Sequence, residues 1–232
     1  MNGVIILAGG ISERLSEIGI PKQYYPVEKP IILYSLLCFQ KSNEISKIII
    51  VADSKWQPKL TELIYKNNIS KFIKFASPGR TRQLSIYNGL KGYKNLLSYD
   101  DYIIIHDGVR PFVTESDIEN VIISSNGFDG STPVISLTDT VYQSADGILI
   151  NKLLKRNELY AGQTPECYIF GKYLFIHESL TDDLICNYNG SSEIAFNNQM
   201  KIKLCKGNIN NIKITTMSDL EYFIFKINKD EL

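Results

Sequence analysis

The sequence predicts a doubly wound α/β fold on a mainly parallel sheet, from which a β-arm protrudes. Apolar runs rich in β-branched residues recur at 3–8, 47–52, 102–106 and 132–137. Such runs are typical of parallel strands that are buried on both faces. Stretches with helical periodicity separate them, and this alternation favours right-handed crossovers within one sheet. The 232 residues hold no repeat or linker, so we expect one domain, residues 1–232, with a large core.

Helices are predicted at 30–40, 56–66 and 81–92 from the spacing of apolar residues. Pro30 suits the first turn of its helix, because that turn leaves its N–H groups unpaired and proline has none. The segment that follows is apolar nearly all round, which indicates a helix buried against the sheet. Ligands of doubly wound sheets bind at the carboxyl ends of the strands. A site is therefore expected in the segments that follow the strands.

The alternation of strands and helices breaks off after the fourth strand. Residues 138–142 resemble a strand, Asp146-Gly147 a hairpin turn and 148–150 the return strand. An isolated hairpin is marginally stable in water. We therefore expect this arm, about residues 138–156, to pack on something else, and a partner subunit is the natural candidate.

Composition excludes some classes of function. Lysine plus arginine and aspartate plus glutamate both number 25, so the net charge is zero and a basic face for nucleic acid is not indicated. The four cysteines are far apart and there are only two histidines, so a zinc site is not expected. Scattered thiols fit a reducing compartment. These residues are Cys38, Cys167, Cys186, Cys205, His106 and His177.

The two ends of the chain bear on its location. The first strand begins at once, without a signal peptide, and no apolar run reaches membrane length, so we expect a cytoplasmic protein. Residues 229–232 spell the retrieval signal Lys-Asp-Glu-Leu of the endoplasmic reticulum. That signal acts only in the secretory lumen, so we interpret it as a coincidence at the charged end of a last helix.

The first strand ends in Gly9-Gly10, and two cations, Arg14 and Lys22, follow. Glycines let a backbone approach a phosphate closely, and consecutive N–H groups form an anion nest. The cations can neutralise a triphosphate. The two common glycine-rich phosphate motifs are absent. The alternative is a plain turn between strand and helix, which would use the same glycines, but such a turn has no need of the cations or of the triplet Pro21-Lys22-Gln23.

Asp107 follows the apolar strand that ends at His106. A carboxylate at this place in a nucleotide-binding fold can hold Mg²⁺ on phosphate oxygens. The alternative is a loop aspartate that caps the next turn. Arg110 can bind phosphate or pair with a structural acid, and we favour the structural role. We interpret His106 as a hydrogen-bonded structural residue.

Residues 79–85 precede the third predicted helix. Arg82, Ser85 and Gly89 share one helical face. Gly79 allows the backbone to contact a base edge, and the helix N-terminus favours an anion. The alternative is a capped surface helix without a ligand.

Two further cations come late in the chain. Arg156 follows the arm, and a tight polar turn, residues 162–165, comes shortly after it. The pattern of residues 211–216 predicts a short alternating strand that bears Lys213, although a lysine on an edge strand is usually solvated. No Ser/His/Asp or Cys/His set for covalent catalysis is evident.

Together these segments resemble the cytidylyltransferases that act on 2-C-methyl-D-erythritol 4-phosphate or D-ribitol 5-phosphate. The resemblance covers nearly the whole chain, and its unlinked motifs occur in the family's order. It implies a Rossmann-like nucleotidyltransferase domain, CTP and a polyol phosphate as substrates, CDP-polyol and pyrophosphate as products, Mg²⁺, and a homodimer that swaps its arms. The motifs are Leu7-Ala8-Gly9-Gly10, Arg14, Pro21-Lys22-Gln23, Gly79 with Arg82 and Ser85, His106-Asp107, Arg110-Pro111, Gln163-Thr164-Pro165 and Asn211-Ile212-Lys213-Ile214-Thr215.

The resemblance also implies roles for single residues. Arg14 and Lys22 match the stabilisers of the transition state, and Asp107 matches the metal-holding aspartate. Thr140 and Arg156 would reach the partner's site across the dimer. The CTP cradle would comprise Leu7, Ala8, Gly9, Gly10, Gly79, Arg80, Thr81, Arg82, Ser85, Asp107 and Gly108. The polyol phosphate would meet Thr140, Arg156, Thr164 and Lys213, of which Arg156 and Lys213 also count as catalytic.

The chain departs from the family pattern in two places. Asn189-Gly190 stands where many members have Thr-Asp, and Asn210 stands where the isoprenoid enzymes have a second acid. Metal binding would therefore depend more heavily on Asp107. Residues 108–112 and 161–165 resemble the ribitol branch, so the sequence predicts D-ribitol 5-phosphate as acceptor, with 2-C-methyl-D-erythritol 4-phosphate as the alternative. A catalytically silent nucleotide-binding protein is the alternative from another class.

Overall fold

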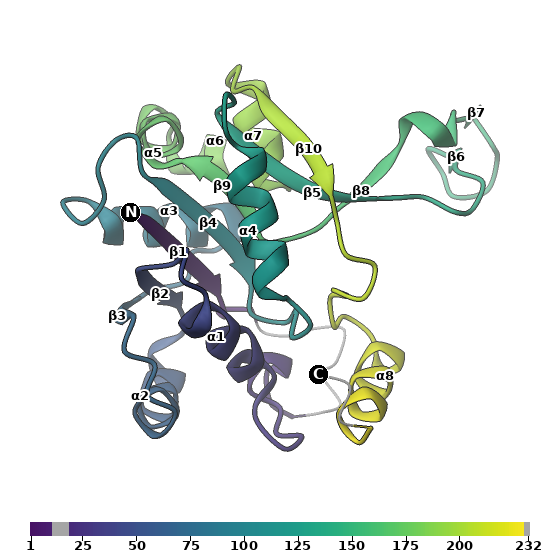
Figure 1. Cartoon of the computed structure of the whole chain (residues 1–232). Helices are drawn as coiled ribbons and strands as arrows, with labels where there is room; N and C mark the ends of the chain where they lie inside the picture. The colour runs from purple at the N-terminus through teal and green to yellow at the C-terminus, as the bar shows by residue number, and fades with distance from the viewer. Residues whose placement is uncertain (11–18, 230–232) are drawn as a thin grey trace.

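The structure is a computed structural model that describes residues 1–10 and 19–229. Its centre is one mixed sheet in the order β10-β5-β9-β4-β1-β2-β3, with β8 paired to β5 (Figure 1). The strands are β1 Asn2–Leu7, β2 Lys47–Val51, β3 Phe72–Ala76, β4 Tyr102–Asp107, β5 Gly130–Ser136, β8 Tyr160–Gly162, β9 Glu166–Ile169 and β10 Ile202–Lys206. The predicted α/β class with a mainly parallel sheet is confirmed.

The strand order creates a crevice at the front edge of the sheet. β1 pairs in parallel with β2 on one side and with β4 on the other. The chain therefore leaves β1 in one direction and later returns on its opposite flank, which opens a gap at the carboxyl ends of β1 and β4. β9 runs antiparallel to β4 and β5, and β8 antiparallel to β5.

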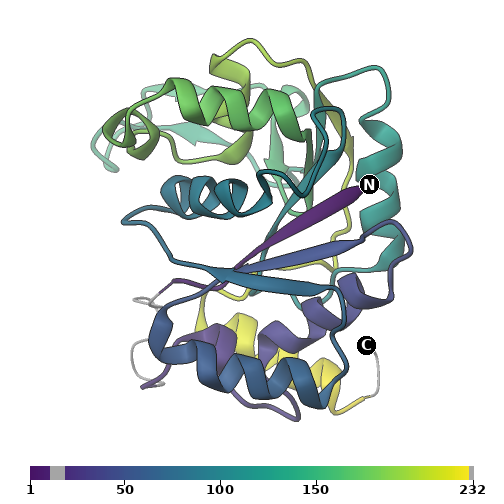
Figure 2. The ribbon, with the colours of Figure 1, turned by 90° about the vertical axis from the view of Figure 1, so that its left-hand side faces the viewer.

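Helices cover both faces of the sheet (Figure 2). Residues of α1, α2 and α4 pack in one hydrophobic cluster, and residues of α3, α5, α6 and α7 pack in another. Because side chains alternate along a strand, Val4 and Ile6 of β1 belong to the first cluster and Ile5 to the second. The helices are α1 Ile31–Lys41, α2 Gln57–Lys66, α3 Arg82–Tyr93, α4 Glu115–Ser124, α5 Phe170–Ser179, α6 Asp182–Cys186, α7 Ser191–Asn197 and α8 Met217–Ile227.

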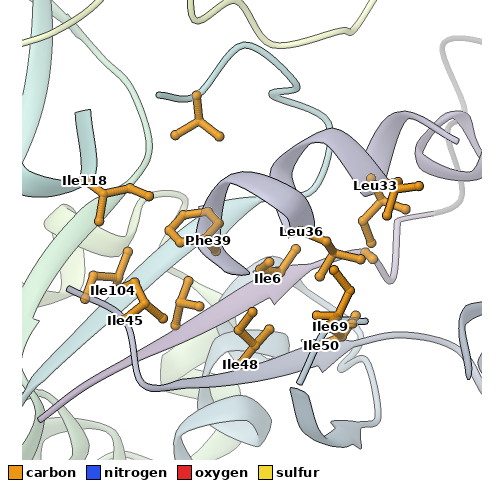
Figure 3. Packing of buried hydrophobic residues seen from close by; sticks show 14 of the residues in the cluster. Ile6, Leu33, Leu36, Phe39, Ile45, Ile48, Ile50, Ile69, Ile104 and Ile118 are labelled. Carbon is orange, nitrogen blue, oxygen red and sulfur yellow. The ribbon is translucent and has the colours of Figure 1, made fainter. Parts of the chain in front are cut away.

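The first cluster shows why α1 is buried nearly all round. Leu36 and Phe39 of α1 lie over Ile6, Ile48 and Ile104 of the three central strands (Figure 3), and all five side chains are fully buried. This packing fixes the strands whose carboxyl ends form the crevice.

The last helix, α8, forms a third cluster apart from the sheet. Leu220, Phe223 and Ile227 pack against Ile31 of α1 and Ile214. Thr216 begins the helix with a capping box closed by Asp219. The segment before α8 is thereby held at the edge of the sheet where β1 and β4 end.

The predicted strands of the central sheet, 3–8, 47–52, 102–106 and 132–137, and the three predicted helices lie within two residues of the observed ones. The predicted strand 211–216 is wrong, because these residues form no strand. Ile214 donates its N–H to the Val109 carbonyl and Asn211 donates its side-chain amide to the Thr164 carbonyl, so isolated hydrogen bonds hold this segment without a ladder. Strands β3, β8, β9 and β10 are not predicted from the sequence. They are short or half-exposed, so they lack the continuous apolar run of the central strands.

The arm is present, but its strands are not where the sequence puts them. The strands are β6 Tyr142–Gln143 and β7 Lys152–Leu153, and they project away from the sheet (Figure 1). The predicted return strand 148–150 is wrong, because Asp146 accepts the N–H groups of Ile148 and Leu149 and so extends the turn.

The apolar tip of the arm is exposed. Ile148, Leu149 and Ile150 are 83%, 67% and 65% exposed. At the end of the chain, α8 stops at Ile227, and the last three residues of the Lys-Asp-Glu-Leu sequence lie outside the described part. Within residues 1–10 and 19–229, no helix has both the length and the apolar character to span a membrane.

Candidate active site

A cavity of about 490 Å³ opens at the carboxyl ends of β1 and β4, where the strand order places the crevice. Its wall combines backbone from two glycine loops with cations from three separate segments. The lining residues are Leu7, Gly9, Gly10, Lys22, Gln23, Gly79, Arg80, Thr81, Arg82, Ser85, Asp107, Val109 and Lys213. The structure therefore brings together most of the residues that the sequence predicts for CTP, together with Lys22 and Lys213.

The glycine loop after β1 is held by the short 3₁₀ turn Lys22–Tyr24. The Gln23 amide donates to the carbonyls of Ala8 at 2.7 Å and Gly10 at 2.8 Å. The Tyr24 hydroxyl donates to the same Ala8 carbonyl. Ala8 itself does not line the cavity, and its carbonyl is occupied by these two donors. Gln23 is a site residue that the sequence analysis did not assign, although it stands within the motif Pro21-Lys22-Gln23.

The second glycine loop is fixed by the start of α3. Ser85 accepts the Gly79 N–H at 3.0 Å and donates to the Thr81 carbonyl at 2.9 Å, while Thr81 caps the helix. A Cβ on Gly79 would lie 2.3 Å from the Leu84 Cβ, so only glycine fits here. Arg80 pairs with Asp183 of α6 and donates to the Cys186 thiol. The predicted helix N-terminus is therefore present and capped at the cavity rim.

Asp107 lies at the centre of a charged cluster. Its Oδ1 accepts from Nε and Nη2 of Arg82, each at 3.1 Å. Its Oδ2 lies 2.9 Å from the Lys213 Nζ and 3.7 Å from the Arg110 Nε. Burial opposes ionisation of Asp107, but these three cations outweigh it and hold its pKa well below the usual range. The cavity thus has an ionised carboxylate within a cationic wall.

The residues around Asp107 act mainly as supports. Arg110 donates from Nη1 to the Asn211 carbonyl at 2.7 Å and is buried, which fits the structural role that the sequence favours. Thr164 accepts the Asp107 N–H at 3.1 Å and contacts the His106 ring. Burial lowers the pKa of His106 to about 3, so this histidine is neutral and structural.

Besides Ala8, four of the predicted residues in the described part do not reach this cavity from the same chain. Thr164 lies behind the wall, and Gly108 is buried there with its N–H donated to the Leu7 carbonyl. Arg156 is on the arm and donates to the Thr138 carbonyl. Thr140 is exposed on the same arm. Arg14 falls outside the described residues.

Two further residues support Arg82 from behind. Its Nη1 donates to the Ser191 hydroxyl at 2.6 Å, and its Nη2 lies 3.8 Å from Oε2 of Glu166. Ser191 begins α7 and Glu166 begins β9. Sequence reasoning did not find either residue, because no local pattern connects positions 82, 166 and 191.

The donor set fits a metal ion that arrives with a nucleotide. Asp107 is the one carboxylate among the lining residues, and Mg²⁺ is commonly held by one or two carboxylates plus substrate phosphates. Among the described residues, no group of three or more His, Cys, Asp or Glu could hold a metal by protein ligands alone. Asn210, which replaces the second acid of the isoprenoid enzymes, is exposed and is absent from the lining.

A doubly wound sheet, two glycine loops and a cationic cavity at the switch point define a nucleotide-binding enzyme of the nucleotidyltransferase class. The chain belongs to the IspD family, described as 2-C-methyl-D-erythritol 4-phosphate cytidylyltransferase, which matches residues 3–228. It is accordingly a CTP-dependent cytidylyltransferase.

Solved structures of similar proteins share the whole fold. One is 4-diphosphocytidyl-2C-methyl-D-erythritol synthase from Anaerococcus prevotii, with 22% identity, a TM-score of 0.81 and 98% of each chain covered. Another is 2-C-methyl-D-erythritol 4-phosphate cytidylyltransferase from Francisella tularensis, with 26% identity and a TM-score of 0.79, covering 97% of this chain and 99% of that one. The enzyme of the same name from Thermus thermophilus has 17% identity and a TM-score of 0.73, with 98% of each chain covered.

Proposed function

We propose that this protein transfers CMP from CTP to 2-C-methyl-D-erythritol 4-phosphate and releases pyrophosphate. The observation that carries the proposal is the cationic cavity around Asp107, in a chain whose family takes its name from this acceptor. The segments that favour D-ribitol 5-phosphate lie largely behind the cavity wall. Of residues 108–112 and 161–165, only Val109 lines the cavity, so these segments say little about which acceptor is bound.

The chemistry joins two anions. A phosphate oxygen of the acceptor attacks the α-phosphorus of CTP, and the bond from that phosphorus to the bridging oxygen of pyrophosphate breaks. Preorganised cations must offset both the repulsion and the charge on the leaving group. Lys22 lines the cavity together with Gly9 and Gly10, and Lys213 lies next to Asp107. We assign the leaving pyrophosphate to Lys22 and Arg14, and the acceptor phosphate to Lys213.

Asp107 would hold Mg²⁺ against the phosphates, and the ion would supply further charge neutralisation there. Arg82 keeps the carboxylate ionised and oriented, since it binds Oδ1 through two N–H groups. The backbone at Gly9, Gly10 and Gly79 would face the cytosine ring.

We also propose a homodimer in which the arm completes the partner's site. The exposed tip residues Ile148, Leu149 and Ile150 would be covered by the second subunit. Arg156 and Thr140 would then reach the partner's acceptor phosphate. The reducing cytoplasm fits the four free cysteines.

Release of pyrophosphate tests the acceptor. We expect turnover of CTP with 2-C-methyl-D-erythritol 4-phosphate, and at least tenfold lower kcat/KM with ribitol 5-phosphate or glycerol phosphate. A preference for ribitol 5-phosphate would reverse the choice of acceptor. Calorimetric binding of CTP without turnover on any of the three would instead indicate the catalytically silent protein.

The same assay tests the nucleotide. The close backbone of the two glycine loops suits a pyrimidine and crowds a purine, so we expect CTP to be preferred over ATP and GTP. A purine triphosphate with a comparable kcat/KM would contradict this expectation.

A further inference from the structure

Glu166 is a buried acid that the proposed mechanism does not use. Its side chain is 7% exposed, and it begins β9 directly beside β4. Its Oε1 accepts from the Tyr168 hydroxyl at 3.0 Å, and its Oε2 faces Arg82 at 3.8 Å. Burial raises the pKa of Glu166, whereas the charge of Arg82 and the hydrogen bond from Tyr168 favour the ionised carboxylate.

Glu166 is the far end of a row of alternating charges. Arg82 lies between Glu166 and Asp107, and Asp107 lies between Arg82 and Lys213. The Ser191 hydroxyl also holds Arg82, because it accepts from the Arg82 Nη1 at 2.6 Å. The row leads from β9 to the cavity, where Lys213 is exposed enough to meet a substrate.

The attachments of Arg82 decide which oxygen of Asp107 is available. Both of its contacts with Asp107 go to Oδ1, which leaves Oδ2 to Lys213. A guanidinium tends to pair with a carboxylate through both oxygens. Such pairing would require Arg82 to move toward Oδ2 of Asp107. The contacts of Arg82 with Glu166 and Ser191 oppose this movement.

We infer that Glu166 is a positioning residue, which holds Arg82 back so that Asp107 keeps Oδ2 directed to Lys213 and the reacting phosphates. This inference rests on the proposed function, because it concerns the geometry of the same transfer. Without the carboxylate, Arg82 moves onto Oδ2 and displaces Lys213. The backbone at Gly9, Gly10 and Gly79 is not part of the row, so most of the contacts assigned to CTP are kept.

The first test is Glu166→Gln, which keeps the shape and removes the charge. We expect kcat to fall at least tenfold, since small misplacements of reacting groups cost factors of up to about 100. The KM for CTP should stay within about twofold. The matched control is Glu62→Gln, which changes an exposed glutamate of α2 that forms a salt bridge with Lys66, and it should keep the kcat. A Glu166→Gln kcat within twofold of the original would overturn the inference.

A double-mutant cycle with Arg82→Met separates positioning from general damage. If Glu166 acts through Arg82, adding Glu166→Gln to Arg82→Met leaves kcat nearly unchanged. The shift in melting temperature caused by Glu166→Gln should have opposite signs in the two backgrounds. In the original protein the substitution lowers the melting temperature. In the Arg82→Met variant it raises the melting temperature, because it then removes an unpaired buried charge. A full, additive loss of kcat, or a lower melting temperature in both backgrounds, would contradict the role.

The melting temperatures and CTP calorimetry need no acceptor. If no acceptor supports turnover, the proposed function fails, while the cycle of melting temperatures still decides whether Glu166 acts on Arg82. If turnover is normal and the cycle is additive, the inference about Glu166 fails alone.

Discussion

Lys22 begins a 3₁₀ turn, and the side chains of the next two residues, Gln23 and Tyr24, both donate a hydrogen bond to the Ala8 carbonyl. Its position relative to the nucleotide loop is therefore fixed. Negative charge on the leaving pyrophosphate develops only as the bond breaks, so a cation here contributes mainly to the transition state.

We expect Lys22→Ala to lower kcat about a hundredfold, or about 3 kcal/mol, with a smaller effect on ground-state binding of CTP. Steady-state kinetics and CTP calorimetry measure the two effects, and Lys66→Ala on the exposed side of α2 is the control. Arg14→Ala should behave like Lys22→Ala. A near-normal kcat with only a raised KM would show that the assigned role is wrong.

Gly9 and Gly10 offer a matched pair at the same loop. A Cβ on Gly9 would lie 2.5 Å from the Pro78 Cβ, whereas a Cβ on Gly10 would meet no atom of the described residues within 4 Å. Gly9→Ala should lower the free energy of unfolding by about 1–3 kcal/mol through overpacking, and Gly10→Ala by less than about 0.5 kcal/mol. Urea denaturation of both variants measures the difference. Equal losses would mean that the loops are not tightly packed.

At the scale of elements, the role that we propose for the arm depends on a second copy of the chain. Its apolar tip has little cover from its own chain, and Arg156 does not line its own cavity. Both facts favour a site that is completed across a dimer.

Mixing two inactive variants tests this exchange. If Arg156 acts in the partner's site, heterodimers of Arg156→Ala with Lys22→Ala contain one site with both original residues. Statistical mixing should then restore about a quarter of the original activity. Proven heterodimers without recovery, or a fully active monomer, would refute arm exchange.

For the whole molecule, a buried histidine makes stability depend on pH. His177 of α5 is fully buried, its Nδ1 bonds to the Tyr173 carbonyl, and its Nε2 has no hydrogen-bond partner among the described residues. Burial lowers its pKa to about 4 from 6.5. Between these values the unfolded chain binds the extra proton, so stability falls as the pH drops from about 6.5 to 4.

His177 alone should lower the free energy of unfolding by about 2 kcal/mol when the pH falls from 7 to 5. His177→Phe should remove this part of the pH dependence, while His106 remains in both proteins and cancels. Urea denaturation at the two pH values measures it. An equally steep loss in the variant would show that His177 does not titrate as its burial requires.

Much of the fold and half of the site could be predicted from local patterns. Continuous apolar runs predict the strands at 3–8 and 102–106. Ligands of such sheets bind at the carboxyl ends of the strands. Gly9, Gly10 and Asp107 follow those strands closely, so their meeting at one edge depends only on the parallel pairing of neighbouring strands. The arm's strands were misplaced because Asp146 binds the backbone of the predicted return strand.

The sequence by itself determined the α/β class, the carboxyl-end location of the site and its nucleotide chemistry, because these depend on short-range periodicity and on motifs next to strands. Only the tertiary structure decided that Lys213 meets Asp107, since the packing of α8 on α1 brings the segment that bears Lys213 to the carboxyl ends of β1 and β4. It also decided that Glu166 and Ser191 hold Arg82. Glu166 is 84 positions from Arg82 in the chain, and Ser191 is 109 positions from it. Contacts over such separations arise from sheet order and helix packing, which leave no local signal in the sequence.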